Sequence, residues 1–344
     1  MNRILVTGGV GYIGSHTVVE LMEQGYEVVI VDNLSNSNIS VLDGIEAIVS
    51  RRPDFVNADC CDYVAMDNVF RSFPDICGVI HFAASKAVGE SVEQPLRYYR
   101  NNTLSLITLL QLMQEHDVRH LVFSSSCTVY GQPDAEHLPV DESAPRKKAL
   151  SPYGNTKQIN EDIIMDQAHA CASLQATILR YFNPIGAHPS ALIGELPNGV
   201  PNNLLPFVTQ TAAGLRKELR VFGDDYNTPD GSCIRDYIYV VDLAKAHVKA
   251  IERMLSGKAE EQVEIFNLGT GRGLSVLEIV RTFEEVTGQS LPYTIVGRRE
   301  GDIEQVWADP HKANTVLEWR ADTPIRDVLL SAWRWEKHLR NIKE

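Results

Sequence analysis

Residues 4–14 read Ile4-Leu-Val-Thr-Gly-Gly-Val-Gly-Tyr-Ile-Gly14. The first four residues are apolar or β-branched, which predicts a short buried strand, and the glycines directly after them predict a tight turn. Beyond Gly14, apolar residues recur at helical spacing as far as Gly25, and Glu27–Asp32 has the composition of a second strand. This region therefore predicts a βαβ unit with a phosphate-binding loop at its first turn.

The glycine loop satisfies two spacings at once. Gly9, Gly11 and Gly14 fit Gly-x-Gly-x-x-Gly, while Gly8, Gly11 and Gly14 fit Gly-x-x-Gly-x-x-Gly. Glycines allow the backbone to approach a pyrophosphate at the positive end of a helix. Asp32 ends the second strand, where its carboxylate can accept both hydroxyls of an adenosine ribose and would repel a 2′-phosphate. We therefore predict NAD as the cofactor, in preference to NADP.

The composition excludes several classes of partner. The 344 residues are 44% hydrophobic and carry a formal net charge of −13, so the basic field that nucleic acids and anionic membranes require is absent. No apolar run approaches the ~20 residues of a membrane span, and Met1-Asn2-Arg3 leads directly into the first strand, so we expect no signal peptide. The cysteines and histidines show no metal-ligand spacing. These features predict a cytoplasmic enzyme without a metal.

Strand and helix patterns continue to alternate after the first unit. Further strands are predicted at 54–57, 78–82, 121–124 and 176–181, and helices at 104–113 and 153–170. Helices between successive strands imply a parallel sheet that is covered on both faces. The predicted fold class is α/β, a Rossmann-type doubly wound parallel sheet with a smaller C-terminal substrate-binding lobe.

Prolines and glycines punctuate the chain from Asn183 onward, so regular alternation ends there. We predict an NAD-binding Rossmann domain over 1–182 and a lobe over 183–344 that mainly binds the substrate, with segments returning to the first domain at about 236–270. The returning segments are 236–242, with the helical pattern after it, and 264–269, and helices are expected in the second lobe at 274–287 and 325–339.

Tyr153 and Lys157 are four residues apart, which places them on one face of a helix. Such pairs are common on helix surfaces, but this one follows the strand that ends at Ser124–Ser126, and ligands of open parallel sheets lie beyond the carboxyl ends of strands. A phenolate base at neutral pH requires the tyrosine pKa to fall by about 3 units, roughly 4 kcal/mol. Lys157 and an oxidised nicotinamide, both cationic, can supply this stabilisation, and Ser126 can relay the proton.

These motifs resemble a known superfamily and one family within it. The glycine loop with Tyr12-Ile13 and the set Ser126, Tyr153 and Lys157 are similar to the extended short-chain dehydrogenases/reductases. Longer stretches resemble the UDP-glucose 4-epimerases along nearly the whole chain. These stretches are Gly8–His16, Asp32–Ser37, His81–Ala84, Lys86–Ser91, Tyr181–His188, Asn202–Leu204, Arg235–Tyr237 and Arg299–Asp302.

The resemblance implies reversible 4-epimerisation of UDP-glucose and UDP-galactose through a transient 4-keto sugar, with NAD tightly bound. It also implies a homodimer, for which the helices at 104–113 and 153–170 are candidates. Ser126, Tyr153 and Lys157 would be catalytic. Together with the loop residues, the cofactor-binding set is Gly8, Gly11, Tyr12, Ile13, Gly14, Asp32, Asn33, Asn36, Ser37, Asp59, Cys60, Phe82, Ala83, Ala84, Lys86, Asn101, Ser124, Tyr153, Lys157, Tyr181 and Phe182.

The UDP-hexose is expected to be held mainly through its nucleotide. The resemblance places Phe222 on the uracil, Arg235 and Arg299 on the diphosphate, and Asp302 on the uridine ribose. Two bidentate arginines can hold a diphosphate within an otherwise acidic protein. The whole substrate-binding set is Lys86, Ser126, Tyr153, Asn183, Asn203, Leu204, Phe222, Arg235, Tyr237, Arg299, Asp302 and Val306.

Three positions depart from the family pattern. Ser85 and Cys127 replace the usual leucine and alanine, and we interpret both as packing variants, Cys127 as a small buried residue rather than a reactive thiol. Val306 stands at a wall of the sugar pocket where members restricted to glucose and galactose carry tyrosine. The smaller side chain predicts that UDP-N-acetylglucosamine and UDP-N-acetylgalactosamine are also accepted.

Two other functions are compatible with a dinucleotide site. A nucleotide-sugar 4,6-dehydratase uses the same scaffold, but it requires an Asp-Glu pair directly after the serine, where this chain has Cys127-Thr128. A non-catalytic sensor of NAD or nucleotide sugars would need only the loop and Asp32, and it has no use for a base such as Tyr153. The epimerase is therefore the preferred prediction.

Overall fold

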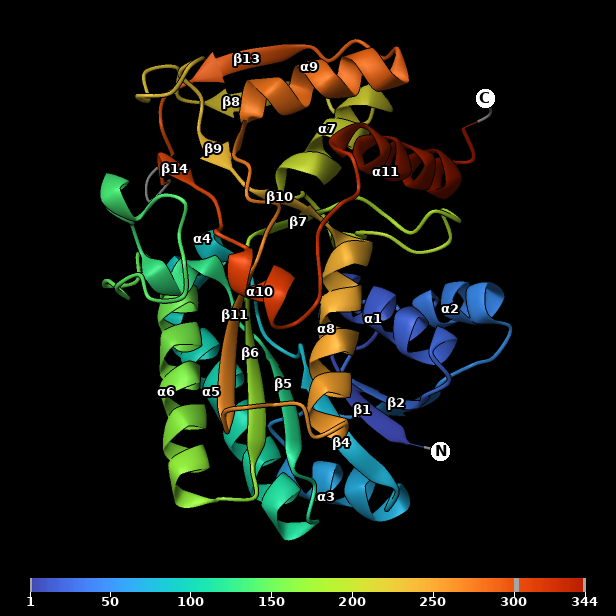
Figure 1. Ribbon diagram of the computed structural model, residues 1–344. Helices are drawn as coiled ribbons and strands as arrows, with labels where there is room; N and C mark the ends of the chain where they lie inside the picture. The colour runs from blue at the N-terminus through green and yellow to red at the C-terminus, as the bar shows by residue number, and fades with distance from the viewer. Residues whose placement is uncertain (1, 300–302, 343–344) are drawn as a thin grey trace.

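A seven-stranded parallel sheet forms the centre of the computed structural model, which describes residues 2–299 and 303–342. The strands lie in the order β11-β6-β5-β4-β1-β2-β3 (Figure 1). Their bounds are β1 (Arg3–Thr7), β2 (Glu27–Asp32), β3 (Asp54–Asn57), β4 (Ile76–His81), β5 (His120–Ser124), β6 (Gln175–Tyr181) and β11 (Val263–Leu268). Every neighbouring pair is parallel. The predicted α/β class with a doubly wound sheet is confirmed.

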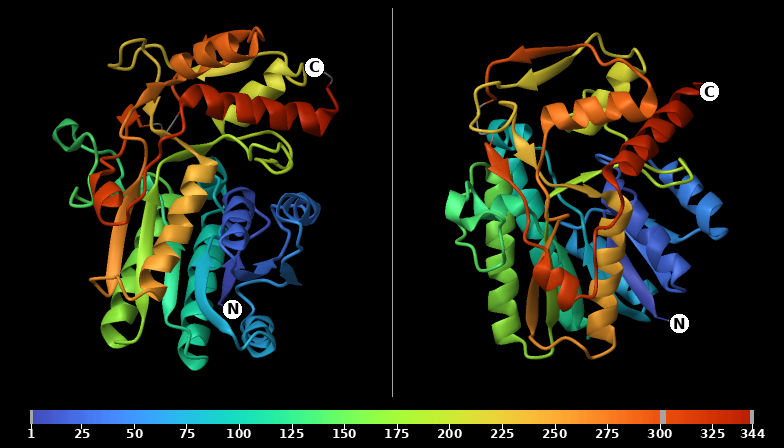
Figure 2. Two further views of the ribbon diagram at one scale, coloured as in Figure 1. Left: turned by 45° about the vertical axis from the view of Figure 1, so that its right-hand side comes forward. Right: turned by 45° about the horizontal axis from the view of Figure 1, so that its top comes forward.

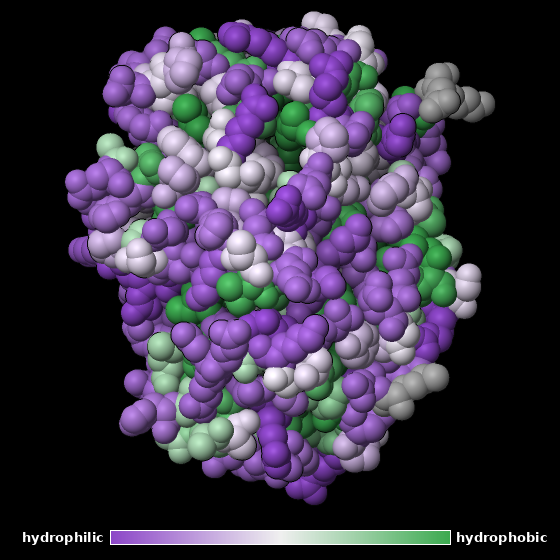
Figure 3. Space-filling model, viewed as in Figure 1, coloured by the Kyte–Doolittle hydropathy of each residue, from purple (hydrophilic) through white to green (hydrophobic). Residues whose placement is uncertain are grey.

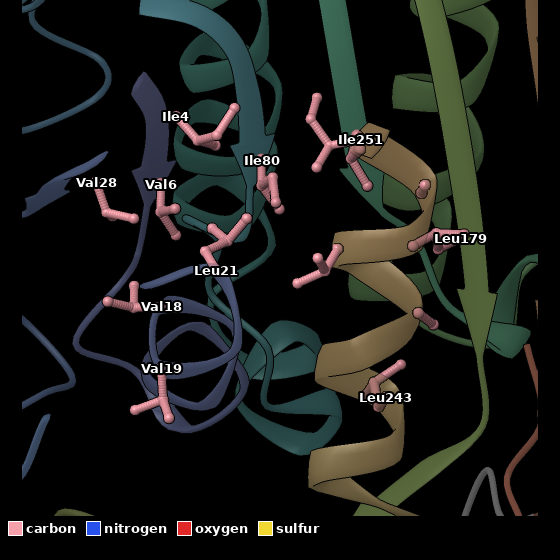
Figure 4. Close-up of a cluster of buried hydrophobic side chains, with 14 of the residues drawn as sticks. Ile4, Val6, Val18, Val19, Leu21, Val28, Ile80, Leu179, Leu243 and Ile251 are labelled. Carbon is pink, nitrogen blue, oxygen red and sulfur yellow. The ribbon is translucent and has the colours of Figure 1, made fainter. Parts of the chain in front are cut away.

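Helices cover both faces of this sheet. One face carries α1 (Tyr12–Glu23), α2 (Val41–Val49) and α8 (Val240–Leu255), and the other carries α3 (Tyr63–Ser72), α5 (Pro95–Glu115) and α6 (Pro152–Ala170). Figure 4 shows Ile4 and Val6 of β1 on the face of α1, with Leu21 between them and Ile80 of β4. Leu5 packs on the opposite face. Because both faces are buried, the strands are continuous apolar runs instead of alternating ones.

The order of the strands reverses direction between β1 and β4. β2 and β3 continue from β1 toward one edge, while β4, β5 and β6 continue toward the other. The switch in strand order therefore lies between β1 and β4, and open α/β sheets bind ligands at the carboxyl ends of the strands at such a switch. Thr7 pairs with His81 at this end of the two strands.

A second lobe lies beyond the carboxyl ends of the sheet strands (Figures 1 and 2). It has its own buried core, in which Leu205, Val221, Phe283 and Trp333 take part. Its larger elements are α7 (Leu204–Ala212), α9 (Val276–Thr287), α11 (Ile325–Arg340) and the strand pairs β7 (Asn183–Ile185) with β10 (Tyr237–Tyr239) and β8 (Leu219–Phe222) with β13 (Tyr293–Val296). A third small sheet joins β12 (Leu274–Ser275), β9 (Ile234–Arg235) and β14 (Gln305–Val306).

Four shorter helices lie in the connections between these elements. They are α4 (Val88–Glu93), α10 (His311–Thr315), η1 (Cys127–Tyr130) and η2 (Ala135–His137). The helix expected over 274–287 begins only at Val276, because Ser275 accepts a hydrogen bond from Glu278 N and forms a capping box with it. The segment 236–242 is split: its strand pairs with β7 in the second lobe, and α8 begins at Val240 and covers the main sheet.

The surface is consistent with the acidic composition. On the face shown in Figure 3, hydrophilic side chains predominate and hydrophobic ones form small separate groups. Within the described residues, every helix is either too short or too polar to cross a bilayer.

Candidate active site

The glycine loop is packed so closely that side chains cannot be added to it. Gly8 has φ +70°, and a Cβ at Gly14 would lie 2.3 Å from the carbonyl oxygen of Gly8. A Cβ on Gly8 would lie 2.9 Å from the backbone nitrogen of Ala83, which follows β4. Both loops at the switch in strand order therefore contact each other through their backbones, and the first N–H groups of a helix such as α1 lack partners within the helix. This geometry suits a pyrophosphate.

Asp32 and its neighbours form a polar group at the ends of β2 and β3. Asp32 Oδ1 accepts hydrogen bonds from Leu34 N at 2.9 Å and Ser37 Oγ at 2.8 Å. Within the described residues Oδ2 takes none, so it is available to ribose hydroxyls. Asn33 donates to Asp59 Oδ2 at 3.2 Å. The structure thus brings together the residues predicted to hold the adenosine, with Cys60 buried beneath them and Asn36 exposed on the same loop.

Ser126 and Tyr153 meet at the carboxyl end of β5. Tyr153 lies in the first turn of α6, where Pro152 occupies the first helical position and Ser151 caps the helix through Gly154 N at 3.1 Å. Burial raises the pKa of Tyr153, a nearby Tyr181 adds to the increase, and a hydrogen bond with Ser126 acts against it. The protein by itself therefore keeps this phenol protonated.

Lys157 lies one turn further along α6 and is only 3% exposed. Its Nζ donates to the carbonyl oxygen of Ser124 at 2.6 Å and lies 5.9 Å from the centre of the Tyr153 ring. Burial lowers the pKa of Lys157 to about 8, while Glu161 acts to raise it. The lysine is thus poised to lose its charge just above neutral pH. It points to a backbone carbonyl, a contact the sequence did not predict.

Tyr181 and Phe182 extend the site at the end of β6. Tyr181 and Ser124 share a hydrogen bond of 2.7 Å between their hydroxyls. His247 of α8 packs against Phe82 and Tyr181. The centre of its ring lies 4.6 Å from the centre of the Phe82 ring and 6.1 Å from that of the Tyr181 ring. Burial lowers the pKa of His247 to about 4, so its imidazole is neutral and packs against the two aromatic rings without adding charge. No signal in the sequence distinguished it from the other scattered histidines.

Lys86 links the cofactor side to the second lobe. Its Nζ lies 3.5 Å from Glu195 Oε1 and 5.9 Å from the centre of the Tyr12 ring. Asn203 donates to the same carboxylate oxygen at 2.5 Å. The structure therefore places two predicted substrate residues around Glu195, which sequence reasoning missed because it lies 109 positions from Lys86.

Asn101 is tied to one of the departures from the family pattern. Its amide donates to Ser85 Oγ at 3.3 Å and to Asn102 Oδ1 at 3.1 Å. Ser85 N in turn donates to Asn102 Oδ1 at 2.8 Å. The hydroxyl of Ser85 is therefore a hydrogen-bond partner for a predicted cofactor residue, a role beyond the packing variant that we expected. The segment with Ala83 and Ala84 leads from β4 to this group.

The predicted nucleotide-binding residues lie in the second lobe, several of them on its small sheets. Arg299 stacks over the ring of Phe222 at 5.6 Å, and Phe222 is 37% exposed. Arg235 pairs with Val306 across β9 and β14. Asn183 pairs with Tyr237 across β7 and β10, and Leu204 begins α7. Asp302 lies outside the described residues.

Val306 is buried close to Cys127, which directly follows Ser126. It packs in one cluster with Val129, Tyr130 and Phe182, and Cys127 borders this cluster. Burial raises the pKa of Cys127 to about 12, which makes it a thiol and not a reactive thiolate. All six cysteines are free.

One group of described residues has ligand atoms close enough for a metal: Asp134, Glu136 and His137. It lies on an exposed turn, and Asp134 is already paired with Lys147 at 2.6 Å. Exposed acidic groups of this kind are common without a metal, and we assign the group no role.

Comparison with known proteins gives the family. Residues 5–331 match the family model described as GDP-mannose 4,6 dehydratase. The UDP-glucose 4-epimerase of Yersinia enterocolitica is 50% identical over 97% of this chain and 97% of its own, and that of Mus musculus is 46% identical over 98% and 97%. The chain belongs to the UDP-glucose 4-epimerases. It is an NAD-dependent isomerase.

Solved structures agree with this assignment. The UDP-glucose 4-epimerase of Stenotrophomonas maltophila, with NAD and a formylated UDP-arabinopyranose, has a TM-score of 0.95 and 47% identity over the whole of both chains. That of Bifidobacterium longum, with NAD+ and UDP, has a TM-score of 0.94 and 45% identity over 99% of both. The UDP-Glc/GlcNAc 4-epimerase of Campylobacter jejuni has a TM-score of 0.83 and 33% identity over 98% and 100%.

The chain spans about half the length of a bifunctional protein of Pachysolen tannophilus, to which it is 50% identical over 97% of its own residues. The family model bears the name of a dehydratase, but Cys127 and Thr128 after the serine leave that position without the carboxyl groups a dehydratase needs. The dehydratase and the non-catalytic sensor are not favoured by these relatives.

Proposed function

We propose that the protein interconverts UDP-glucose and UDP-galactose by transient oxidation at C4 of the sugar. The observation that carries this proposal is the buried group of Ser126, Tyr153 and Lys157 at the carboxyl end of β5, on the same edge of the sheet as the glycine loop that would hold a dinucleotide. When bound, NAD supplies the acceptor and donor of a hydride. Because the net redox change is zero, the cofactor has no reason to leave during turnover.

Side chains of the protein transfer the proton of the sugar 4-hydroxyl. Tyr153 takes the proton of the sugar 4-hydroxyl, and Ser126 relays it. The raised pKa of Tyr153 in the protein alone means that Lys157 and the positive nicotinamide must together stabilise its phenolate. A neutral His81, whose pKa burial lowers to about 3, adds no competing positive charge. Tyr153 is thereby a base only when the oxidised cofactor is present.

The nucleotide is held by residues of the second lobe, which frees the hexose to turn. Arg235 and Arg299 would bind the diphosphate, Phe222 would stack on the uracil, and Asp302 would hold the ribose. We assign residues 1–182, with α8 and β11, to the cofactor and the remainder mainly to the UDP-sugar. The 4-keto sugar can then turn, so that the C4 carbonyl is reduced on its opposite face.

The same site should also accept the acetylated sugars. Val306 is a small side chain beside Phe182 and Cys127, where a tyrosine would occupy much more of the space next to the catalytic residues. The similarity to the UDP-Glc/GlcNAc 4-epimerase of Campylobacter jejuni supports this extension.

A direct assay tests the proposal. The purified protein is incubated with UDP-galactose without added cofactor, and the nucleotide sugars are separated by chromatography. We expect UDP-glucose to appear. A keto-deoxy sugar would indicate a dehydratase, and an unchanged substrate would indicate a sensor.

A further inference from the structure

A buried ion pair joins α6, which carries Tyr153 and Lys157, to β6. Glu161 of α6 and Arg180 of β6 are 1% and 4% exposed. Arg180 binds the carboxylate with two nitrogens: Nε donates to Oε1 at 3.0 Å and Nη2 donates to Oε2 at 2.6 Å. Breaking such a pair would leave a buried charge without compensation, so the two side chains hold each other in place.

The carboxylate also holds the segment that carries the catalytic serine. Ser125 Oγ donates to Glu161 Oε1 at 2.6 Å, and Ser125 N donates to the carbonyl oxygen of Leu179 at 2.9 Å. Ser125 lies between Ser124, whose carbonyl accepts from Lys157 Nζ, and Ser126, which faces Tyr153. The hydroxyl of Ser125 therefore helps to fix both the contact of Ser124 with Lys157 and the contact of Ser126 with Tyr153.

The other end of the pair reaches the short helix η1. Arg180 Nη1 donates to Tyr130 Oη at 2.9 Å, and Tyr130 Oη donates to Asn267 Oδ1 at 2.7 Å. Tyr130 ends η1, which starts directly after Ser126. The pair thus connects α6, β6, β11 and both sides of Ser126.

We propose that Glu161, held by Arg180, is a positioning residue for the epimerisation: it locks Ser125 so that Ser126 Oγ meets the phenol of Tyr153 and the Ser124 carbonyl meets Lys157 Nζ. The inference rests on the proposed function. Glu161 is one turn from Lys157 on the same helix. It touches neither substrate nor cofactor, and its effect passes through the serine segment and through its charge.

The charges around Lys157 give the direction of a pH effect. Its own helix contributes Tyr153, which is neutral in the protein alone, and the negative Glu161. β4 contributes His81, which is neutral because burial lowers its pKa to about 3. Glu161 itself is paired with the positive Arg180 and with Arg146, whose Nη1 donates to Oε2 at 3.4 Å. Glu161 acts to raise the pKa of Lys157, so removing its charge should make this pKa fall further, and the charge of Lys157 should be lost at lower pH.

The test compares Glu161→Gln with a matched control, Glu264→Gln. Glu264 forms a similar bidentate pair with Arg253, at 2.8 Å and 2.9 Å, but near the start of β11, at the opposite end of the sheet from the site. Both variants break a buried pair. For Glu161→Gln we expect kcat to fall roughly 10- to 100-fold, KM for UDP-galactose to stay within about 2-fold, and the alkaline limb of kcat to move to lower pH, with bound NAD retained.

Glu264→Gln should keep kcat and its pH profile even if its melting temperature falls. Ser125→Ala removes the hydroxyl without leaving a buried charge, so it should fold even where Glu161→Gln does not. It should reduce kcat several-fold, and its effect should not add to that of Glu161→Gln. A crystal structure of the NAD-loaded Ser125→Ala variant should show Ser126 displaced from Tyr153.

An unchanged kcat and an unmoved Ser126 in Ser125→Ala would overturn the proposal, as would an equal loss of kcat in Glu264→Gln. If either result is found while the wild-type enzyme epimerises UDP-galactose normally, only the positioning role of Glu161 is contradicted. A wild-type protein that leaves UDP-galactose unchanged would instead contradict the proposed function.

Discussion

Tyr153 shows how one residue depends on its surroundings. In the protein alone its pKa is raised, and its partner Lys157 donates to a backbone carbonyl instead of the phenol. The residue types and their spacing predicted the pair, but the cost of burying a phenolate could not be predicted from spacing. It depends on which side chains surround the hydroxyl after folding.

The Tyr153→Phe variant should lose turnover about 10²- to 10⁴-fold, because the proton of the sugar hydroxyl then has no base. The variant should still be isolated with NAD, since the ring remains. Steady-state kinetics and the nicotinamide content of the denatured protein measure both. Tyr293→Phe, at an exposed position of β13, is the control and should change neither quantity. Full activity in Tyr153→Phe would exclude tyrosine as the base.

Val306 permits a prediction about specificity. Val306→Tyr should reduce kcat/KM for UDP-N-acetylglucosamine by roughly 10- to 200-fold, because the added ring fills the space beside the sugar. UDP-galactose should be much less affected. Competition between the two sugars in one assay gives the ratio, and parallel losses for both sugars would show that the variant disturbs the site as a whole.

At the scale of an element, the close packing of the glycine loop between β1 and α1 should control the affinity for NAD. Gly14→Ala places a Cβ 2.3 Å from the Gly8 carbonyl oxygen, so the loop must move and NAD binding should fall at least 10-fold. Gly89→Ala in α4 is the control, since a Cβ there meets no atom within 4 Å. Isothermal titration of the apo variants with NAD measures the difference. Equal affinity of both variants would show that the loop does not hold the pyrophosphate.

The contact between α1 and α8 should make stability depend on pH. Glu20 is buried there, and desolvation raises its pKa from 4.5 to about 7. The folded protein then binds more protons than the unfolded chain between these values, so this contribution is full below about pH 4.5 and is lost as the pH rises through about 7. Urea unfolding from pH 5 to 8 should show a shallower decline in Glu20→Gln than in wild type, whereas the exposed control Glu93→Gln should follow wild type.

Most elements could be predicted from local sequence, because buried parallel strands are short apolar runs bounded by turn residues. The strands at 54–57 and 120–124 fall where the pattern indicated, to within a residue. The second lobe could not be assigned this way, because its strands of two to four residues depend on long-range pairing, such as that of Arg235 with Val306. Glu161 and Glu195 escaped notice for the same reason: their partners are distant in sequence.

At the scale of the whole molecule, we propose a homodimer formed through α5 and α6. Leu104 and Ile107 on α5 are each 36% exposed, and Met165 on the adjacent α6 is 46% exposed. Leu104→Glu combined with Ile107→Glu should convert the dimer to a monomer in light scattering coupled to gel filtration. The exposed control Val64→Glu on α3 should not. A wild-type mass of 38.4 kDa in solution would contradict the dimer.

In epimerisation by transient oxidation, the hydrogen removed from C4 of the sugar returns to C4 of the same molecule. UDP-galactose labelled with deuterium at C4 is therefore converted by the purified protein without added cofactor, and the UDP-glucose formed is analysed by mass spectrometry and NMR. We predict that the label remains at C4, with no uptake of hydrogen from water. Loss of the label to solvent, or conversion only when free NAD is supplied, would contradict transient oxidation by a cofactor that stays bound.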